Sequence, residues 1–585
     1  MCMIVECSWE VLNKVGGIYT VITSKAESAT KKFSDYVLVG PLFSGHTPDL
    51  FVEKAPPEDI KKACSALSEK GIRSVYGTWS IPGTPQVVLL DATHMHADTN
   101  LIKGQLWEEF GIDSLHSGWD FDEPLRWAWA CGMFIEQIAQ QKQVIGHFHE
   151  WLAGFGGLYL RMNNVPAGFV FTTHATMLGR TLSANNVVHV YNTDDLRQID
   201  ARSEAKRLGV LDKHSCEFAC ANASDVFTTV SDMTASEAEI LLERTADVIT
   251  YNGISKDDYP ADHIRDMQRH TSREKLYDFM TYFFGLNETD SLENSLFFVT
   301  SGRYEFRNKG LDVVSAALKR LEEHLISINS PISVYGLYLI PGDARGIRSD
   351  ILEKKSAYSE IKDIIVKRQG ALCRSVVQQA QSAEAVTCSS LFSSSVRQRL
   401  RVLASTLHSE KAPFSTHNLG DESNDPIINS FYANGLENVS SSHVRVALLP
   451  FYLTGSDGLV DMTYNEFLLG ADLGVFASLY EPWGYTPAES ICLGVPAVAP
   501  DTSGFGQFMS GHAQEGFFLL PRMNRCFEDV VSELTDIFIQ YVSLSPSERS
   551  RQHIAARKLS EEILWDTFIS RYEAAYALAR SRLHN

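Results

Sequence analysis

Short apolar runs alternate with helical patterns along most of the chain, and this alternation constrains the fold more than any other feature. The run "MIVECSW" near the start has the character of a buried strand. In the next segment, "GGIYTVITSKAES", Ile18, Val21, Ile22 and Ala26 share one helical face, and the strand-like "DYVLVGPLF" follows. The runs "VIGHFH", "AGFVFTTH" and "SDVFTTV" each precede a further helical stretch. Strands that alternate with helices predict parallel sheets covered on both faces, which is the doubly wound α/β fold.

The length of the chain indicates that the alternating segments form two domains rather than one. A chain of 585 residues is too long for a single hydrophobic core. A second alternating series begins at "SLFFVTSGRY" and continues through "GVFASLY" and "GVPAVAP". The predicted limits are 1–260 for an N-terminal Rossmann-like domain, 261–294 for a helical connector, 295–545 for a C-terminal Rossmann-like domain with a helical insertion at about 345–425, and 546–585 for C-terminal helices that pack back on the N-terminal domain.

The net charge excludes two classes of partner. It is −20, whereas nucleic acids and anionic membranes are bound by basic surfaces.

No apolar run reaches the length of a membrane span, and the start "MCMIVECSWE" lacks the order of a signal peptide. Ten cysteines suggest reduced thiols in the cytoplasm, and Cys216 with Cys220 has no second pair that would complete a metal site. Because the protein is acidic overall, any phosphate ligand must be held by a local group of cations and backbone amides.

Polar motifs follow the predicted strands, where open α/β sheets bind their ligands. In "KVGGIYTV", Gly16 and Gly17 would let backbone amides approach a phosphate, although such glycines are more often simple turn formers. In "HFHEWLAG", two histidines and Glu150 could orient a sugar or assist proton transfer, or the histidines could be satisfied within the core. "HATMLGR" adds His174 and Arg180, and this arginine could reach a diphosphate or lie on the surface.

A stronger signal comes from "SGRYEFRNKG", which joins a strand to a helix. Arg303 and Lys309 lie on this glycine-bounded loop, and Arg307 is a third cation between them. Hydrogen bonds from such cations to phosphate oxygens contribute roughly 1.5–3 kcal/mol each. The loop could therefore hold a diphosphate on an otherwise acidic protein.

Two carboxylates flank the stiff segment "YEPWGYTPAES" near the C-terminal end of the second series. The pattern predicts a helix with Thr486 at the N-cap, Pro487 at N1 and Glu489 at N3, so a capping box would explain Glu489 fully. Glu481 has no such structural explanation, because it stands at the end of a strand beside a helix N-terminus. We therefore expect Glu481 to bind a ligand.

These motifs occur in one order, and in this the chain resembles the glycogen synthases of animals and fungi. The matching segments are "NKVGGIYTV", "HFHEWLAG", "TTHATMLGR", "ASDVFTTVS", "GRYEFRNKG", "YNEF" and "YEPWGYTPAES". The resemblance implies a retaining glycosyltransferase in which two Rossmann-like domains face each other across a cleft, the GT-B type. It further implies UDP-glucose as the donor, glycogen or another α-1,4-glucan as the acceptor, and no metal or cofactor.

Motif matching carries roles onto particular residues. The resemblance implies that Glu481, Glu150, Arg303 and Lys309 are catalytic. Arg303 and Lys309 would hold the diphosphate, Glu481 would bind the transferred glucose, and Glu150 would lie near its anomeric carbon. The amides of Gly16 and Gly17 and the side chain of Arg180 would assist at the diphosphate. Glu489 would bind the ribose, Tyr464 would stack near the uracil, and the amides of Tyr485 and Thr486 would meet the leaving phosphate. The implied substrate-binding residues are Gly16, Gly17, His174, Arg180, Asn252, Tyr464, Trp483, Gly484, Tyr485, Thr486 and Glu489.

The chain departs from the family pattern in the regions that control activity. In "SERSRQHIAARKLSEEILW" the dense arginine cluster of the family's regulatory helix is thinned to Arg549, Arg551, Arg557 and Lys558. The extension and the serine-rich tail that carry phosphorylation sites in many relatives are not expected here. The resemblance implies a homo-oligomer, with a tetramer as the suggested state, and is compatible with a glycogenin-like primer. We expect intact catalysis with reduced control.

Two other functional classes remain open at this point, as does ADP-glucose as an alternative donor. One is a catalytically inactive glucan-binding or scaffold protein on the same fold, which the presence of every expected site residue disfavours. The other is a glucan phosphorylase, which shares the two-domain plan but needs a lysine that holds pyridoxal phosphate.

Overall fold

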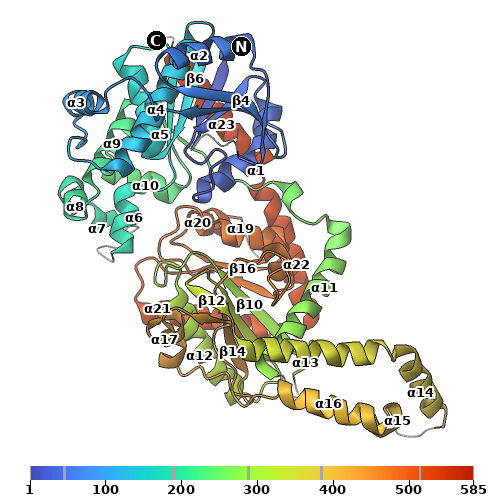
Figure 1. Ribbon diagram of the computed structural model, residues 1–585. Helices are drawn as coiled ribbons and strands as arrows, with labels where there is room; N and C mark the ends of the chain where they lie inside the picture. Colours follow the sequence, from blue (N-terminus) through green and yellow to red (C-terminus); the bar gives the residue numbers. More distant parts are fainter. Residues whose placement is uncertain are drawn as a thin grey trace.

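The structure is a computed structural model that describes residues 2–43, 48–185, 193–285, 290–382, 387–512 and 515–583. Two large sheets lie in separate halves of the molecule, each flanked by helices (Figure 1). The two-domain α/β fold that the alternation predicts is confirmed. Residues 286–289 of the predicted connector and 383–386 of the predicted insertion lie outside the described residues, and the exact domain limits stay a prediction.

The N-terminal sheet has the strand order β3-β4-β5-β2-β1-β6-β7-β8-β9. All neighbours are parallel except the pairs β3–β4 and β4–β5, which are antiparallel at one edge. Its strands are β1 Met3–Cys7, β2 Tyr36–Pro41, β3 Phe51–Glu53, β4 Arg73–Trp79, β5 Gln86–Asp91, β6 Val144–His149, β7 Gly168–Thr173, β8 Val226–Thr229 and β9 Val248–Ile249. The central strands β1, β2, β6 and β7 are buried along their whole length, because helices cover both faces of a parallel sheet.

The two faces of this sheet have different cores. Met3, Val5 and Cys7 of β1 face one core with α4 and α5, whereas Ile4 faces a second core with α1 and α23. This division follows the two-residue period of a strand. The helices before the connector are α1 Gly17–Lys32, α2 Glu58–Glu69, α3 Thr99–Phe110, α4 Trp119–Ala139, α5 Glu150–Met162, α6 Met177–Ala184, α7 Thr193–Leu196, α8 Ala201–Arg207, α9 Leu211–Ala223 and α10 Asp232–Leu241.

The C-terminal sheet is wholly parallel and has the order β14-β11-β10-β15-β16-β17. Its strands are β10 Ser295–Ser301, β11 Ser333–Leu339, β14 Val444–Leu449, β15 Leu473–Val475, β16 Ala497–Pro500 and β17 Phe517–Leu520. The helices that follow these strands are α12 Leu311–Ser327, α17 Pro426–Ala433, α18 Tyr464–Leu469, α19 Tyr485–Cys492, α20 Gly504–Ser510 and α21 Phe527–Val542.

Within the range of the predicted insertion the chain forms a long helical arm. In Figure 1 this arm projects away from the body of the lower half. It consists of α13 Ser349–Val366, α14 Gln369–Ser382, α15 Cys388–Leu391 and α16 Ser394–Leu407, and α13 packs against α16. A small antiparallel pair, β12 Ala344–Ile347 with β13 His417–Leu419, joins its two ends.

The chain passes between the two halves twice, and the two passages are bonded to each other. The first leads from β9 to α11 (Asp262–Met280), and the second leads from α22 (Pro546–Leu559) to α23 (Trp565–Arg582). The Ile254 amide donates to the Ile563 carbonyl at 3.0 Å, and the Trp565 amide donates to the Ile254 carbonyl at 3.1 Å. Helix α23 then lies against α1 and the N-terminal sheet, so both chain ends lie in the upper half (Figure 1). Among the described helices, none is long and apolar enough to cross a membrane.

Candidate active site

The candidate residues lie near the topological switch point of each sheet, where the strand order reverses its direction. In the N-terminal sheet β2 and β6 lie on opposite sides of β1, and in the C-terminal sheet β11 and β15 lie on opposite sides of β10. Open α/β sheets bind ligands in the crevice at this point. A cavity of about 480 Å³ opens there, and residues of both halves line it: Arg180, Ala184, Arg303, Glu305, Phe306, Arg307, Asn308, Tyr480, Glu481 and Pro482.

The loop after β10 brings a cation to Glu481. Lys309 forms an ion pair with the Glu481 carboxylate, which also accepts a hydrogen bond from Ser478 Oγ at 3.3 Å. Gly310 has a positive φ of 66°, and a Cβ there would lie 1.9 Å from the Ala477 carbonyl oxygen. Only glycine therefore lets this loop approach the segment that carries Glu481.

The charges on this wall favour an anionic Glu481. Burial raises the pKa of Glu481, but Lys309 and then Arg303 outweigh it, so the pKa lies below its ordinary value. Arg303 keeps 68% of its side chain exposed and pairs with Glu305 at 3.0 Å. One wall of the cavity thus carries the Glu481 carboxylate and Arg303, and Lys309 of the same loop pairs with that carboxylate from outside the lining.

The predicted capping box at Glu489 is wrong. Helix α19 begins at Tyr485 rather than after Thr486, its N-cap is Gly484 with a φ of 113°, and no side chain caps it. Pro487 is then the third helical residue, and Glu489 lies too far along the helix to cap its start. The left-handed conformation of Gly484, which the sequence pattern does not reveal, moves the start of the helix.

Glu489 lies instead in a half-buried polar site with Tyr464. Burial raises the pKa of Glu489 to about 7, and a hydrogen bond with Tyr464 opposes this. The Tyr464 hydroxyl also pairs with Ser301 Oγ at 2.9 Å, at the end of β10. A helix leaves its first N–H groups without intrahelical partners, so the amides of Tyr485 and Thr486 at the start of α19 are suited to an anion.

The structure corrects the role expected of the Gly16 amide. That amide donates to Glu10 Oε2 at 2.7 Å, and the Tyr19 amide donates to the same oxygen at 2.9 Å. Glu10 therefore occupies the start of α1 where a phosphate was predicted. A Cβ on Gly17 would meet no atom within 4 Å, so the loop borders open space at that residue.

Glu150 is held in a strained conformation at the end of β6. Its φ is 63°, a left-handed value that is uncommon for a residue other than glycine. Its carboxylate accepts the His174 amide at 2.8 Å and the Ala175 amide at 3.3 Å. Burial raises the pKa of Glu150 to about 7, with Arg180 acting in the opposite direction. Glu150, His174 and Arg180 therefore belong to one cluster, and Arg180 extends it into the cavity.

Two predicted substrate residues lie beside the passages between the halves. Trp483 is 3% exposed and packs with Tyr251, Phe505 and Phe568 at ring-centroid distances of 5.6, 6.0 and 6.2 Å. This packing places the Trp483 ring in the core, while its Nε1 has no hydrogen-bond partner among the described residues, so the expected substrate contact stays a prediction. Asn252 is 4% exposed, and its Oδ1 has no hydrogen-bond partner among the described residues, so it stays a candidate.

One interdomain contact beside Glu481 was missed in the sequence. The Tyr480 hydroxyl donates to Glu237 Oε1 at 3.2 Å, and Thr176, the N-cap of the helix that carries Arg180, donates to the same oxygen. Burial raises the pKa of Glu237 to about 7. Glu237 lies on α10, whose pattern is that of an ordinary surface helix, so no sequence signal distinguishes it.

The arginines of α22 have partners within the protein. Arg549 donates to the Leu544 carbonyl at 2.7 Å, Arg551 lies 3.4 Å from Glu515, and Arg557 lies 2.9 Å from Asp262 of α11. These contacts point to three separate places. They do not form one cationic patch.

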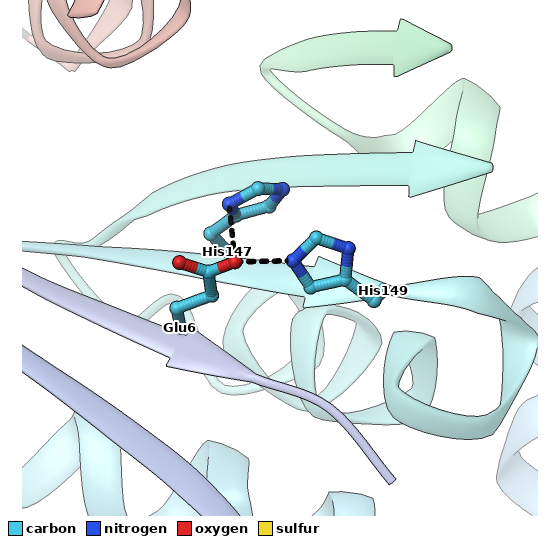
Figure 2. Close-up of side chains that lie close together, drawn as sticks. All are labelled: Glu6, His147 and His149. Atoms are coloured by element: carbon cyan, nitrogen blue, oxygen red, sulfur yellow. Dashed lines mark hydrogen bonds and ion pairs between the residues drawn. The ribbon is translucent and has the colours of Figure 1, made fainter. Parts of the chain in front are cut away.

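A buried group of Glu6, His147 and His149 has the composition of a metal site (Figure 2). His149 Nε2 lies 2.6 Å from Glu6 Oε1, but the Lys25 ammonium lies 2.5 Å from that same oxygen. His147 uses both ring nitrogens elsewhere, with Tyr576 at 2.9 Å and Thr172 at 2.6 Å. Lys25 already supplies the positive charge that a metal ion would bring, so these residues do not fit a metal.

Comparison with a solved structure identifies the fold. The catalytic domain of starch synthase IV from Arabidopsis thaliana superposes with a TM-score of 0.51 over 99% of both chains at 13% identity. The fold is that of the GT-B glycosyltransferases. The family model described as glycogen synthase matches residues 6–585. The liver glycogen [starch] synthase of Rattus norvegicus is 33% identical over 99% of this chain and 83% of its own, and isoform 1 of Saccharomyces cerevisiae is 32% identical over 100% and 86%. The chain belongs to the glycogen synthase family.

Proposed function

We propose that the protein transfers glucose from UDP-glucose to the non-reducing end of an α-1,4-glucan such as glycogen, with retention of configuration. The observation that carries this proposal is the Lys309–Glu481 ion pair beside Arg303, on the wall of a cavity between the two domains. It sets cations suited to a diphosphate next to a carboxylate suited to a sugar. The names of the relatives support the choice of reaction.

The charges fit the bond changes of the reaction. The bond between the anomeric carbon and the phosphate oxygen breaks, and its electron pair leaves with UDP. Positive charge then develops on the sugar and negative charge on the phosphate. Arg303, Lys309 and the amides at the start of α19 would stabilise the leaving phosphate, and Glu481 would stabilise and orient the sugar. The acceptor hydroxyl would attack from the same face and give its proton to the leaving phosphate oxygen.

The rival classes differ from this proposal in ways that are simple to measure. A glucan phosphorylase would contain pyridoxal phosphate and absorb in the visible range. An inactive scaffold would bind glucan without releasing UDP. We also propose a cytoplasmic homo-oligomer, with a tetramer as the expected state, that extends a glycogenin-like primer.

The purified protein is expected to extend glycogen from UDP-glucose in the presence of EDTA, because Arg303 and Lys309 supply the charge that a divalent ion would otherwise bring to the diphosphate. The measurement is incorporation of labelled glucose, with ADP-glucose as the comparison donor. Activity that disappears with chelator and returns with magnesium would contradict the mechanism. No incorporation from either donor would favour the scaffold.

Arg303→Ala and Lys309→Ala are each expected to weaken UDP binding by about 1.5–3 kcal/mol, roughly tenfold to a hundredfold. Arg303→Ala removes a charged donor from the cavity lining, and Lys309→Ala removes the cation that pairs with Glu481. Calorimetric titration with UDP measures the effect. Arg345→Ala is a suitable control, because Arg345 neither lines the cavity nor pairs with a residue that does, its partner being Asp343. Equal UDP affinity in the wild type, Arg303→Ala and Lys309→Ala would mean that both residues are solvated loop residues that do not bind the diphosphate.

Glucose 6-phosphate is expected to stimulate the enzyme by less than tenfold. In relatives a dense arginine cluster binds this dianion, whereas Arg549, Arg551 and Arg557 here have separate partners within the protein. The check is the initial rate at subsaturating UDP-glucose with and without millimolar effector. Stimulation of tenfold or more, about 1.4 kcal/mol of coupling, would reveal an effector site built from other residues.

A further inference from the structure

A chain of hydrogen bonds leads from His174 at the candidate site into the core of the N-terminal domain. His174 Nε2 lies 2.9 Å from His149 Nδ1, and His149 Nε2 lies 2.6 Å from Glu6 Oε1. Glu6 and His149 are 0% and 1% exposed, and His174 is 8% exposed. Figure 2 shows the inner pair, with the His149 ring directed at the Glu6 carboxylate. None of these three residues lines the cavity itself, and His174 is linked to it through Glu150, which accepts the His174 amide and lies near Arg180 of the lining.

The partners of Glu6 determine which nitrogens carry hydrogen. Lys25 Nζ donates to Glu6 Oε1 at 2.5 Å and the Tyr36 hydroxyl donates to Oε2 at 2.5 Å, so both oxygens act as acceptors. Although burial opposes ionisation, Lys25 and His149 hold the pKa of Glu6 well below its usual value. An ionised carboxylate can only accept, so His149 must carry its hydrogen on Nε2.

The position of the hydrogen on the His149 ring in turn determines the tautomer of His174. Burial lowers the pKa of both histidines, so both rings are neutral and each has one N–H. His149 Nδ1 is then a lone pair, and His174 Nε2 must donate to it. The remaining nitrogen, His174 Nδ1, is an acceptor without a hydrogen-bond partner among the described residues. The backbone amide of the same residue donates to Glu150, so this acceptor belongs to the Glu150 cluster.

We infer that Glu6 and His149 are positioning residues that hold His174 in its Nε2–H tautomer, so that His174 Nδ1 accepts a hydrogen bond from a sugar hydroxyl. The identity of the ligand, a sugar hydroxyl, rests on the proposed function. The tautomer of His174 does not, because contacts within the free protein determine it. The third residue of the buried group is not part of the relay. His147 is 4.0 Å from Glu6 Oε1 and pairs with Tyr576 and Thr172 instead.

The tautomer can be measured without substrate. In the wild-type protein, NMR of ¹³C,¹⁵N-labelled histidine is expected to show His174 neutral at pH 7 with its hydrogen on Nε2, assigned by loss of the signal in His174→Ala. An Nδ1–H tautomer, a mixture of the two, or a charged ring would overturn the inference. Because no turnover is needed, this result stands whether or not the proposed reaction is correct.

A double-mutant cycle tests whether His149 acts through His174. His149→Phe is expected to lower kcat/KM for UDP-glucose by about two- to tenfold, the value of one hydrogen bond. In a His174→Ala background the same change is expected to have no further effect, because the two residues act as one unit. Equal losses in both backgrounds would overturn the relay. His147→Phe is the matched control, since it alters the adjacent ring of the same strand and should give the same change in both backgrounds.

Discussion

Glu481→Gln is expected to lower kcat by roughly a hundredfold or more, the size of effect seen when one preorganised electrostatic group is removed. Glutamine keeps the shape of the side chain but removes the charge that would stabilise the developing positive centre on the sugar. It also frees Lys309 from its ion pair. UDP affinity should therefore be unchanged or higher while kcat falls, and rapid-quench turnover with parallel UDP titration measures both.

Glu489→Gln provides the matched control eight residues further on. Glu489 has no capping role and its pKa is about 7, so the neutral side chain should preserve the fold. The expected result is weaker donor binding, seen as a raised KM for UDP-glucose, with a much smaller change in kcat. Turnover of Glu481→Gln at the wild-type rate would show that the site has been assigned wrongly.

Trp565→Ala is expected to destabilise the protein by about 3–5 kcal/mol, the usual range for truncating a buried tryptophan. The Trp565 ring is 1% exposed and lies against Gly253, where an added Cβ would be 2.7 Å from it. Its indole nitrogen donates to Ser24 Oγ at 2.7 Å, so the change also removes a partner from α1. A fall in melting temperature of roughly 6–20 °C should be visible by calorimetry.

Trp119→Ala is the control for this prediction, because Trp119 is 65% exposed at the start of α4. A surface substitution of this kind is expected to change stability by no more than about 0.5 kcal/mol. Equal melting temperatures for Trp565→Ala and the wild type would mean that the second passage between the domains does not brace the N-terminal core.

The alternation of apolar and helical segments was sufficient to predict the fold class, because parallel strands buried on both faces are recognisable as short apolar runs. β1, β6 and β7 are examples, with every residue buried. Strand order was not predictable in the same way, because it depends on which helices cross over which face. The positions where both sheets change direction therefore became visible only in the structure.

Local motifs predicted the neighbourhood of the site better than its contacts. The loop of Arg303 and Lys309 was recognisable, but its ion pair with Glu481 depends on the close approach at Gly310. The capping signal around Glu489 misled because a glycine conformation, not the Thr-Pro pair, sets the start of α19. The contacts of Glu10, Glu237 and Glu6 were missed, because no sequence pattern connects these carboxylates with the residues that they contact. Glu237, in addition, lies in a helix with an ordinary surface pattern.

The position of α23 makes folding depend on the order of synthesis. Val21, Ile22 and Val170 of the first domain share a core with Phe568 and Tyr572, which are synthesised long after them. At 5–20 residues per second, the nascent domain would wait roughly 20–60 s between the completion of β9 and the arrival of this helix. For that time this face of the first sheet is covered by α1 but not by α23. The first domain to be started is therefore completed only after the second domain has been synthesised, because α23 follows it in the chain.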